Sequence, residues 1–148
     1  TDKSNTLPQR VQPKNLPQII ALDQLVFGAS RAQFINALVK EYPGKCWMLN
    51  RNSSLTGFML GRDGNNYQQI GPVVARDTVD AKSLISAALN DLANQPVVVD
   101  VLADKTGLVD WLQAIGFIQQ RQFTRMYKNE NIQSDSDKQY LVAGPEFG

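Results

Sequence analysis

The chain contains no histidine and only one cysteine, Cys46, in 148 residues. Without histidine it cannot form a Ser-His-Asp triad, a Cys-His pair or an imidazole metal site. A single cysteine excludes an internal disulfide and a zinc cluster built from thiolates. These absences leave no sign of an oxidising compartment, so we expect a cytoplasmic protein that holds no metal.

Excess charge and long apolar runs are missing as well. Fifteen basic residues stand against fourteen acidic ones, which gives a net charge of +1. Such a balance produces no strong positive electrostatic potential that would attract DNA or RNA. No apolar run approaches the ~20 residues that a membrane span needs. We therefore expect neither a nucleic-acid partner nor a membrane partner.

The length and composition predict one ordinary domain. A chain of 148 residues with a hydrophobic fraction of 43% can bury a single packed core. Residues 1–13 are polar and contain two prolines, which favours a tail with a short first strand around Gln9–Gln12. Residues 14–148 are then expected to form the single domain.

Apolar spacing predicts a mixed α/β order, β-α-α-β-β-β-α-β-α-β-β. The expected helices cover residues 15–27, 30–42, 81–92 and 108–115, and the strands after the first cover residues 46–49, 55–60, 67–74, 97–101, 121–127 and 140–143. Asp63-Gly64 favours a hairpin turn, so the first three of these strands should form an antiparallel meander. The β-branched run Val97–Val101 is typical of a strand that is buried on both faces and paired in parallel. Helices should therefore cover both faces of a mixed sheet.

Five stretches carry a family resemblance. They are Asp23 with VFGASR (Val26–Arg31), IGPVVARDTVDAKSL (Ile70–Leu84), WLQAIGF (Trp111–Phe117), RQFTRM (Arg121–Met126) and AGPEFG (Ala143–Gly148). In this order they resemble the GNAT-type N-acetyltransferase superfamily, and more narrowly the GNAT-like domain at the C-terminal end of tandem acetyltransferases. The resemblance covers nearly the whole chain and implies a GNAT-like fold.

The resemblance implies that acetyl-CoA binds where the fourth and fifth strands splay apart. The fourth strand carries Gly71-Pro72. Proline has no amide hydrogen to donate to a neighbouring strand and glycine permits a bulge, so the pairing of the strands should fail there. The alternative is that Gly-Pro only kinks an edge strand. We expect an opening near Val73 to Arg76 that is wide enough for the pantetheine arm, with the pyrophosphate on the amides that begin the next helix.

The segment from Arg76 to Ala81 resembles the family's pyrophosphate loop in part. Arg76 and Ala81 match the pattern, but Val79 stands where the family has its central glycine. A β-branched residue hinders the positive φ and the close backbone approach that glycine allows. Asp77 and Asp80 put negative charge beside the diphosphate, or else they cap the helix. The cofactor-binding positions implied by the resemblance are Val73, Val74, Ala75, Arg76, Thr78 and Ala81.

Acetyl transfer to an amine needs a base for the ammonium proton and an acid for the departing thiolate. Where many relatives have a glutamate on the fourth strand, this chain has Tyr67, Gln68 and Gln69, and Leu112 replaces a tyrosine that many relatives use. The substitutes are Asp100 as the base and Tyr127 as the acid. Asp100 interrupts an apolar run, so it either points into a polar cleft or pairs with a cation such as Arg125. Tyr127 could instead pack on a face of the sheet.

Three further side chains have expected roles. Arg31 and Arg125 are candidates for clamping an anionic group of the substrate, with surface salt bridges as the alternative. Cys46 should be a buried, inert thiol, because no histidine exists to activate it.

Two functions remain open from the sequence. The first is an acetyl-CoA-dependent N-acyltransferase that moves an acetyl group directly to a small-molecule amine. The second is a non-catalytic GNAT-fold module that serves a tandem acetyltransferase as a partner or ligand-sensing domain. A second GNAT domain or a second copy of the chain is the partner that the resemblance implies.

Overall fold

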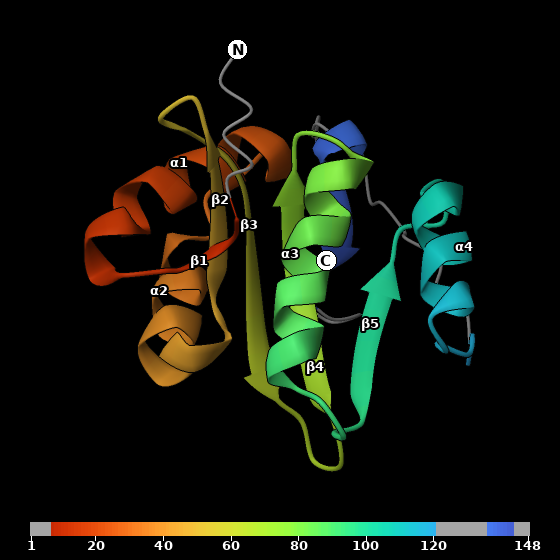
Figure 1. Cartoon of the computed structure of the whole chain (residues 1–148). Helices are drawn as coiled ribbons and strands as arrows, with labels where there is room; N and C mark the ends of the chain where they lie inside the picture. The colour runs from red at the N-terminus through yellow and green to blue at the C-terminus, as the bar shows by residue number, and fades with distance from the viewer. Residues whose placement is uncertain (1–6, 121–135, 144–148) are drawn as a thin grey trace, which may run out of the picture.

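The computed structural model describes residues 7–120 and 136–143, and its centre is a six-stranded mixed sheet. From β1 to β4 the strands lie side by side in chain order (Figure 1), and β6 pairs with both β4 and β5. The strands are β1 (Gln9–Arg10), β2 (Trp47–Arg51), β3 (Ser54–Asp63), β4 (Gln68–Ala75), β5 (Val97–Val101) and β6 (Gln139–Val142). The mixed α/β fold predicted from the sequence is confirmed.

The first four strands form an antiparallel meander. β1 pairs with β2, β2 with β3, and β3 with β4, all antiparallel. The β3–β4 hairpin turns immediately after Asp63, where the Gly64 amide donates to the carbonyl of Tyr67 at 2.8 Å. The meander predicted from Asp63-Gly64 is therefore confirmed.

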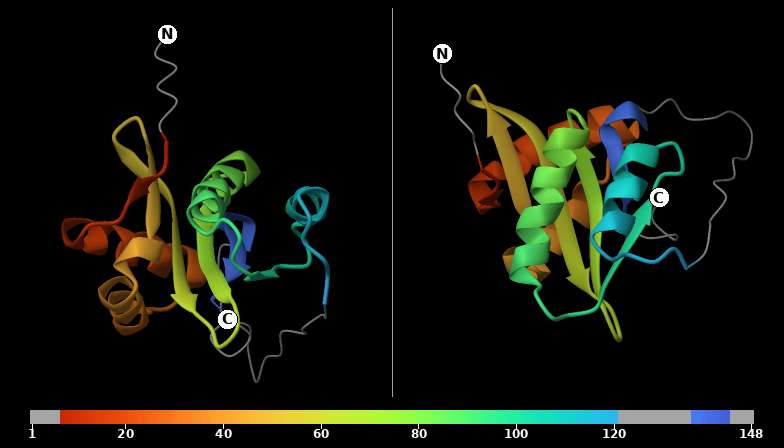
Figure 2. Two further views of the ribbon diagram at one scale, coloured as in Figure 1. Left: turned by 60° about the horizontal axis from the view of Figure 1, so that its bottom comes forward. Right: turned by 45° about the vertical axis from the view of Figure 1, so that its right-hand side comes forward.

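Helices cover both faces of the sheet (Figures 1 and 2). They are α1 (Leu16–Phe27), α2 (Ala32–Glu41), α3 (Thr78–Asp91) and α4 (Thr106–Ala114). Apolar residues of α1 and α2 pack in one core cluster with Phe58 and Leu60, and those of α3 and α4 pack in another with Met59. Successive residues of β3 thus face opposite layers, as the two-residue period of a strand requires. None of the helices within the described residues is both long and apolar enough to cross a lipid bilayer.

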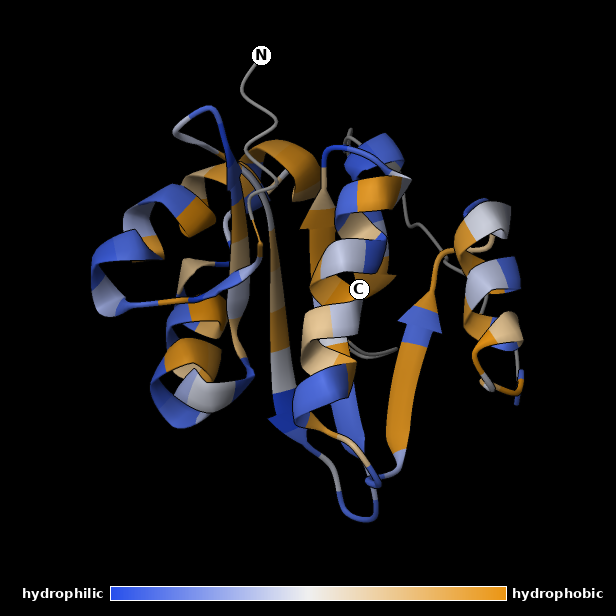
Figure 3. Cartoon of the chain, in the orientation of Figure 1, coloured by the Kyte–Doolittle hydropathy of each residue, from blue (hydrophilic) through white to orange (hydrophobic). Residues whose placement is uncertain are grey.

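The strand β5 has the bounds that its β-branched run predicts, and it pairs in parallel with β4. The helix α3 supplies the crossover between these two strands. The expectation of burial on both faces is wrong, because every residue of β5 keeps some exposure and Val98 is 36% exposed. Figure 3 shows β5 as apolar except at one polar position just before its last residue. The predicted strand over residues 121–127 lies outside the described residues.

Candidate functional site

The strands β4 and β5 separate partway along their length. Their parallel pairing runs from Gln68–Val97 to Ile70–Val99 and then stops. The next residue of β4 is Gly71, at φ +148°, followed by Pro72, which has no amide to donate. Only glycine takes such a φ readily, so the predicted break in pairing is confirmed at the predicted dipeptide.

The gap between β4 and β5 holds β6. On one side Leu141 pairs with Val73 and Gln139 with Val74, both antiparallel. On the other side β6 pairs antiparallel with the end of β5, through the pairs Asp100↔Val142 and Val101↔Leu141. Figure 2 shows β6 (blue) between the two strands. The expectation of an open wedge is therefore wrong, since the chain's own strand occupies the backbone of β4 that an arm would use.

Tertiary contacts hold β6 in this gap. Tyr140 is 4% exposed, and its phenol oxygen accepts a hydrogen bond from the Thr78 hydroxyl at 3.4 Å. The Lys105 ammonium lies 4.5 Å from the centre of the Tyr140 ring and donates to the carbonyl of Asp137 at 2.8 Å. The amide of Leu102 donates to the carbonyl of Tyr140 at 3.3 Å. The start of α3 and the segment between β5 and α4 thus bind the same strand.

The first turn of α3 is capped by the chain itself. Asp77 is the N-cap residue, and its carboxylate accepts from the amide of Asp80 at 2.9 Å. The Ala81 amide donates to the Asp77 carbonyl at 3.1 Å. Val79, at the family's glycine position, projects to solvent with 69% exposure. The capping role considered for Asp77 is thus confirmed, and this helix start already carries a carboxylate where a diphosphate would need free amides.

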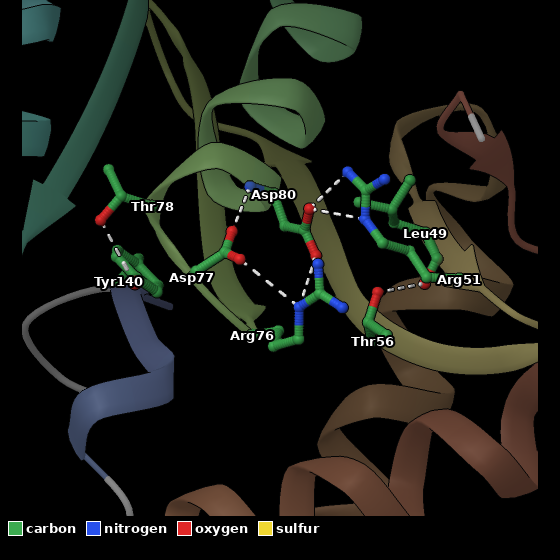
Figure 4. A network of polar contacts seen from close by, with 8 residues as sticks. All are labelled: Leu49, Arg51, Thr56, Arg76, Asp77, Thr78, Asp80 and Tyr140. Carbon is green, nitrogen blue, oxygen red and sulfur yellow. Dashed lines mark hydrogen bonds and ion pairs between the residues drawn. The ribbon is translucent and has the colours of Figure 1, made fainter. Parts of the chain in front are cut away.

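Asp80 is fully buried and paired with Arg51 from the end of β2 (Figure 4). Both Nε and Nη2 of Arg51 donate to Asp80 Oδ1, at 2.9 and 2.6 Å. These bonds raise the pKa of the Arg51 guanidinium above its ordinary value. Asp80 Oδ2 lies 3.7 Å from Arg76 Nε. Asp80 therefore anchors α3 to β2, and nothing in the sequence around Arg51 marks it as the partner, because the two residues are 29 positions apart.

The candidate base, Asp100, lies on β5 beside the gap. Its carboxylate accepts a hydrogen bond from Nε2 of the buried Gln69 on β4 at 3.1 Å. This bond links the two strands at the level where they diverge. The residues Arg125 and Tyr127, predicted to bind substrate and to donate a proton, lie outside the described residues.

Arg31 lies just before α2 and is held by a buried ion pair. Its Nε and Nη2 donate to the two carboxylate oxygens of Asp23 at 3.0 and 2.6 Å, and the side chains are 7% and 0% exposed. The guanidinium also stacks over the ring of Phe27, 3.9 Å from its centre. This two-pronged contact joins α1 to α2. The substrate-binding role of Arg31 stays a prediction.

Cys46 has the environment of an inert thiol. It is fully buried, and its Sγ donates to the carbonyl of Tyr42 at 3.3 Å. Burial raises the pKa of the thiol from its ordinary 9.0 to about 11. At neutral pH Cys46 is therefore protonated, and its nucleophilic form is suppressed.

A cleft lies at the C-terminal end of α3, away from the gap between β4 and β5. This open cleft of about 460 Å³ is lined by Arg10, Glu41, Tyr42, Pro43, Gly44, Lys45, Asp63, Asp91, Leu92 and Gln95. Its charges largely neutralise one another, since Arg10 pairs with Asp91 at 2.9 Å and Lys45 pairs with Asp63. The hydrogen bond from Lys45 lowers the pKa of Asp63 below its ordinary value. These pairs join β1 to the end of α3, and the segment before β2 to the end of β3.

Known structures share this fold. Ard1 from Thermoplasma volcanium superposes with a TM-score of 0.65 at 18% identity, covering 93% of this chain and 97% of that one. AAC(6')-Iy, solved with the bisubstrate analogue CoA-S-monomethyl-acetylneamine, gives 0.61 at 15% identity, covering 85% and 99%. Arabidopsis thaliana Naa50, solved with the bisubstrate analogue CoA-Ac-MVNAL, gives 0.60 at 14% identity, covering 92% and 95%.

Sequence comparison gives the family. No curated protein matches the chain significantly. The family model described as an acetyltransferase (GNAT) domain matches residues 19–141, a span that runs from α1 to β6 and contains the divergence of β4 and β5. The chain therefore belongs to the GNAT acetyltransferase family.

Proposed function

We propose that this domain is an acetyl-CoA-dependent N-acetyltransferase that transfers the acetyl group directly to an amine. One observation carries the proposal: beyond Ile70–Val99 the backbone of β4 is free of β5 and pairs with an extended segment at Val73 and Val74. A pantetheine arm is an extended segment with amide groups, so it can make the same kind of hydrogen bonds. The structural relatives solved with CoA-containing bisubstrate analogues support this assignment.

The residues present fit acetyl-CoA in part. The edge of β4 from Val73 to Ala75 suits the arm once β6 has left it. The beginning of α3 suits the diphosphate less well, because Asp77 already satisfies an amide and Asp80 adds a buried carboxylate. Arg76 lies 3.4 Å from the Asp77 carboxylate and Thr78 donates to Tyr140, so each would have to exchange this partner to contact phosphate oxygens. We therefore expect acetyl-CoA to bind weakly, mainly through its arm.

Each proposed catalytic group has one task. When bound, acetyl-CoA supplies an activated acetyl thioester. A backbone amide of β4 that faces the gap, at Val73 or Val74, would polarise the thioester carbonyl. Asp100 would accept a proton from the acceptor's ammonium group, which leaves a neutral amine as the nucleophile, and Tyr127 would donate a proton to the departing thiolate. Arg31 and Arg125 are the proposed contacts for an anionic group on the acceptor.

Calorimetric titration with acetyl-CoA, followed by release of free CoA thiol with a panel of small amines, tests the proposal. The wild-type chain should bind acetyl-CoA and release thiol only when an acceptor is present. Asp100→Asn should reduce turnover at least about tenfold with an affinity change under threefold, as expected for a lost base. The matched substitution Asp110→Asn on the exposed face of α4 should leave both unchanged. Equal loss of binding and turnover in Asp100→Asn would assign Asp100 to structure.

The occupied gap favours a second candidate, a non-catalytic GNAT module. With β6 paired on both sides and the first turn of α3 capped by Asp77, the domain is complete without acetyl-CoA. Its role would be to support a catalytic GNAT domain, as the second domain of a tandem chain or as a second copy, in the cytoplasm. Absence of acetyl-CoA binding in the wild-type chain, and in variants that loosen β6, would select this candidate.

A further inference from the structure

The gap between β4 and β5 cannot hold β6 and an acyl-CoA arm together. Each edge position of a strand offers its amide and carbonyl to one neighbour at a time. Val73 and Val74 are already paired with Leu141 and Gln139. Their use by acetyl-CoA therefore requires β6 to leave.

One residue of β6 fits this gap poorly. Gln139 is 1% exposed, and neither its amide nitrogen nor its amide oxygen has a hydrogen-bond partner within the described residues. Burying an unsatisfied amide costs free energy that hydration would restore. The pairing of β4 with β6 is also irregular between Val73 and Val74. When it is paired with β4, β6 is thus destabilised at the end next to Val74.

The rest of the sheet keeps its partners without β6. β4 remains paired along β3, and β5 remains joined to β4 from Gln68–Val97 to Ile70–Val99. Departure of β6 would break its own short ladders, expose the buried side chains of Tyr140 and Leu141, and break the hydrogen bonds that Lys105 and Thr78 make in its neighbourhood. Because the other strands keep their pairing, local opening of β6 costs less free energy than unfolding of the domain.

We propose that β6 is an exchangeable plug that competes with acyl-CoA for the backbone of Val73 and Val74. The inference rests on the proposed function and adds its regulation. Any interaction that tightens β6 lowers the affinity for acyl-CoA, and any that loosens it raises that affinity, because only the open state is competent to bind. Gln139 weakens the plug, whereas Lys105 strengthens it.

Amide hydrogen exchange tests the opening itself. In the wild-type chain the amides of residues 139–142 should exchange at least about 100-fold faster than the central amides of β3. Gln139→Leu removes the unsatisfied amide at similar side-chain volume, so it should slow exchange in β6 and raise the melting temperature. Gln113→Leu, at an exposed position of α4, is the matched control and should not alter exchange in β6. Exchange in β6 as slow as in β3 would overturn the plug.

Calorimetry with acetyl-CoA tests the competition. Gln139→Leu should weaken acetyl-CoA binding about tenfold, and Gln113→Leu should not change it. Lys105→Ala should tighten binding about three- to fivefold, because it removes the bond to Asp137 and the contact with the Tyr140 ring. Binding that is measurable but equal in all four proteins overturns the plug alone. No binding in any of them overturns the proposed function and the plug with it.

Discussion

At the residue scale, two carboxylate side chains lie in the first turn of α3, where a bound anion would be placed. The Asp77 carboxylate accepts a hydrogen bond from a backbone amide at the beginning of α3, and Asp80 places a buried charge one turn further along. A diphosphate bound here would lie close to the exposed carboxylate of Asp77, in the position where a helix dipole otherwise favours an anion, whereas the buried charge of Asp80 is paired with Arg51. Asp77 is therefore the main local reason to expect weak acetyl-CoA binding.

Two substitutions of Asp77 distinguish its effect as a helix cap from the effect of its negative charge. Asp77→Ala removes the bond to the Asp80 amide and should cost about 1 kcal/mol of unfolding free energy. Asp77→Asn keeps an acceptor for that amide and should leave stability nearly unchanged. Both variants remove the same negative charge, so both should bind acetyl-CoA about threefold more tightly. Denaturant titration and calorimetry measure the two effects. Tighter binding in neither variant would show that Asp77 does not face the diphosphate.

At the element scale, the shape of β4 depends on Gly71. Its φ of +148° lies in a region that side chains other than glycine rarely adopt. A Cβ placed on Gly71 would lie 2.1 Å from the carbonyl oxygen of Val142 in β6. The same residue thus ends the pairing of β4 with β5 and admits β6 into the resulting gap.

Gly71→Ala should therefore destabilise the domain by about 2 to 4 kcal/mol, through backbone strain and the clash with β6. Gly107→Ala is the matched control, because a Cβ there meets no atom within 4 Å and the residue lies in α4. It should change stability by less than about 1 kcal/mol. Urea unfolding of both variants makes the comparison. A cost for Gly71→Ala no greater than that for Gly107→Ala would contradict the close approach of β6.

At the scale of the whole molecule, the absence of histidine shapes the dependence of stability on pH. With no side chain of ordinary pKa near neutrality, the unfolding free energy should be nearly flat between about pH 6 and 8. The buried thiol of Cys46 has its pKa raised to about 11, and burial also raises the pKa of Tyr42. The folded state therefore holds protons in alkali that the unfolded state has lost.

Stability should consequently fall as the pH rises from about 9 to 11, because the unfolded chain ionises Cys46 first. The thiol alone contributes a loss of about 2 kcal/mol over this range, given its shift from 9.0 to about 11. Cys46→Ala should remove that part of the slope even though the cavity lowers stability at pH 7. Denaturant unfolding at a series of pH values measures the slope. An unchanged alkaline slope in Cys46→Ala would show that the thiol is not the group responsible.

Local sequence determined most of the secondary structure. The β-branched run fixes β5 at Val97–Val101, and Asp63-Gly64 turns the β3–β4 hairpin. Gly71-Pro72 predicted where the pairing of β4 with β5 fails, because a positive φ and a missing amide are properties of the two residues themselves. The family resemblance likewise rests on short motifs that are read along the chain.

The tertiary structure alone decided what fills the gap and which charges pair. The apolar residues of β6 predict a strand but not its neighbours, since many edges can accept the same four residues. Its insertion between β4 and β5 follows from the length of free edge that Gly71 leaves. The pair of Arg51 with Asp80 brings together residues that are 29 positions apart, which no local pattern encodes. Contacts between distant segments depend on the packing of the whole domain, and they therefore decide whether acetyl-CoA can reach the site proposed for it.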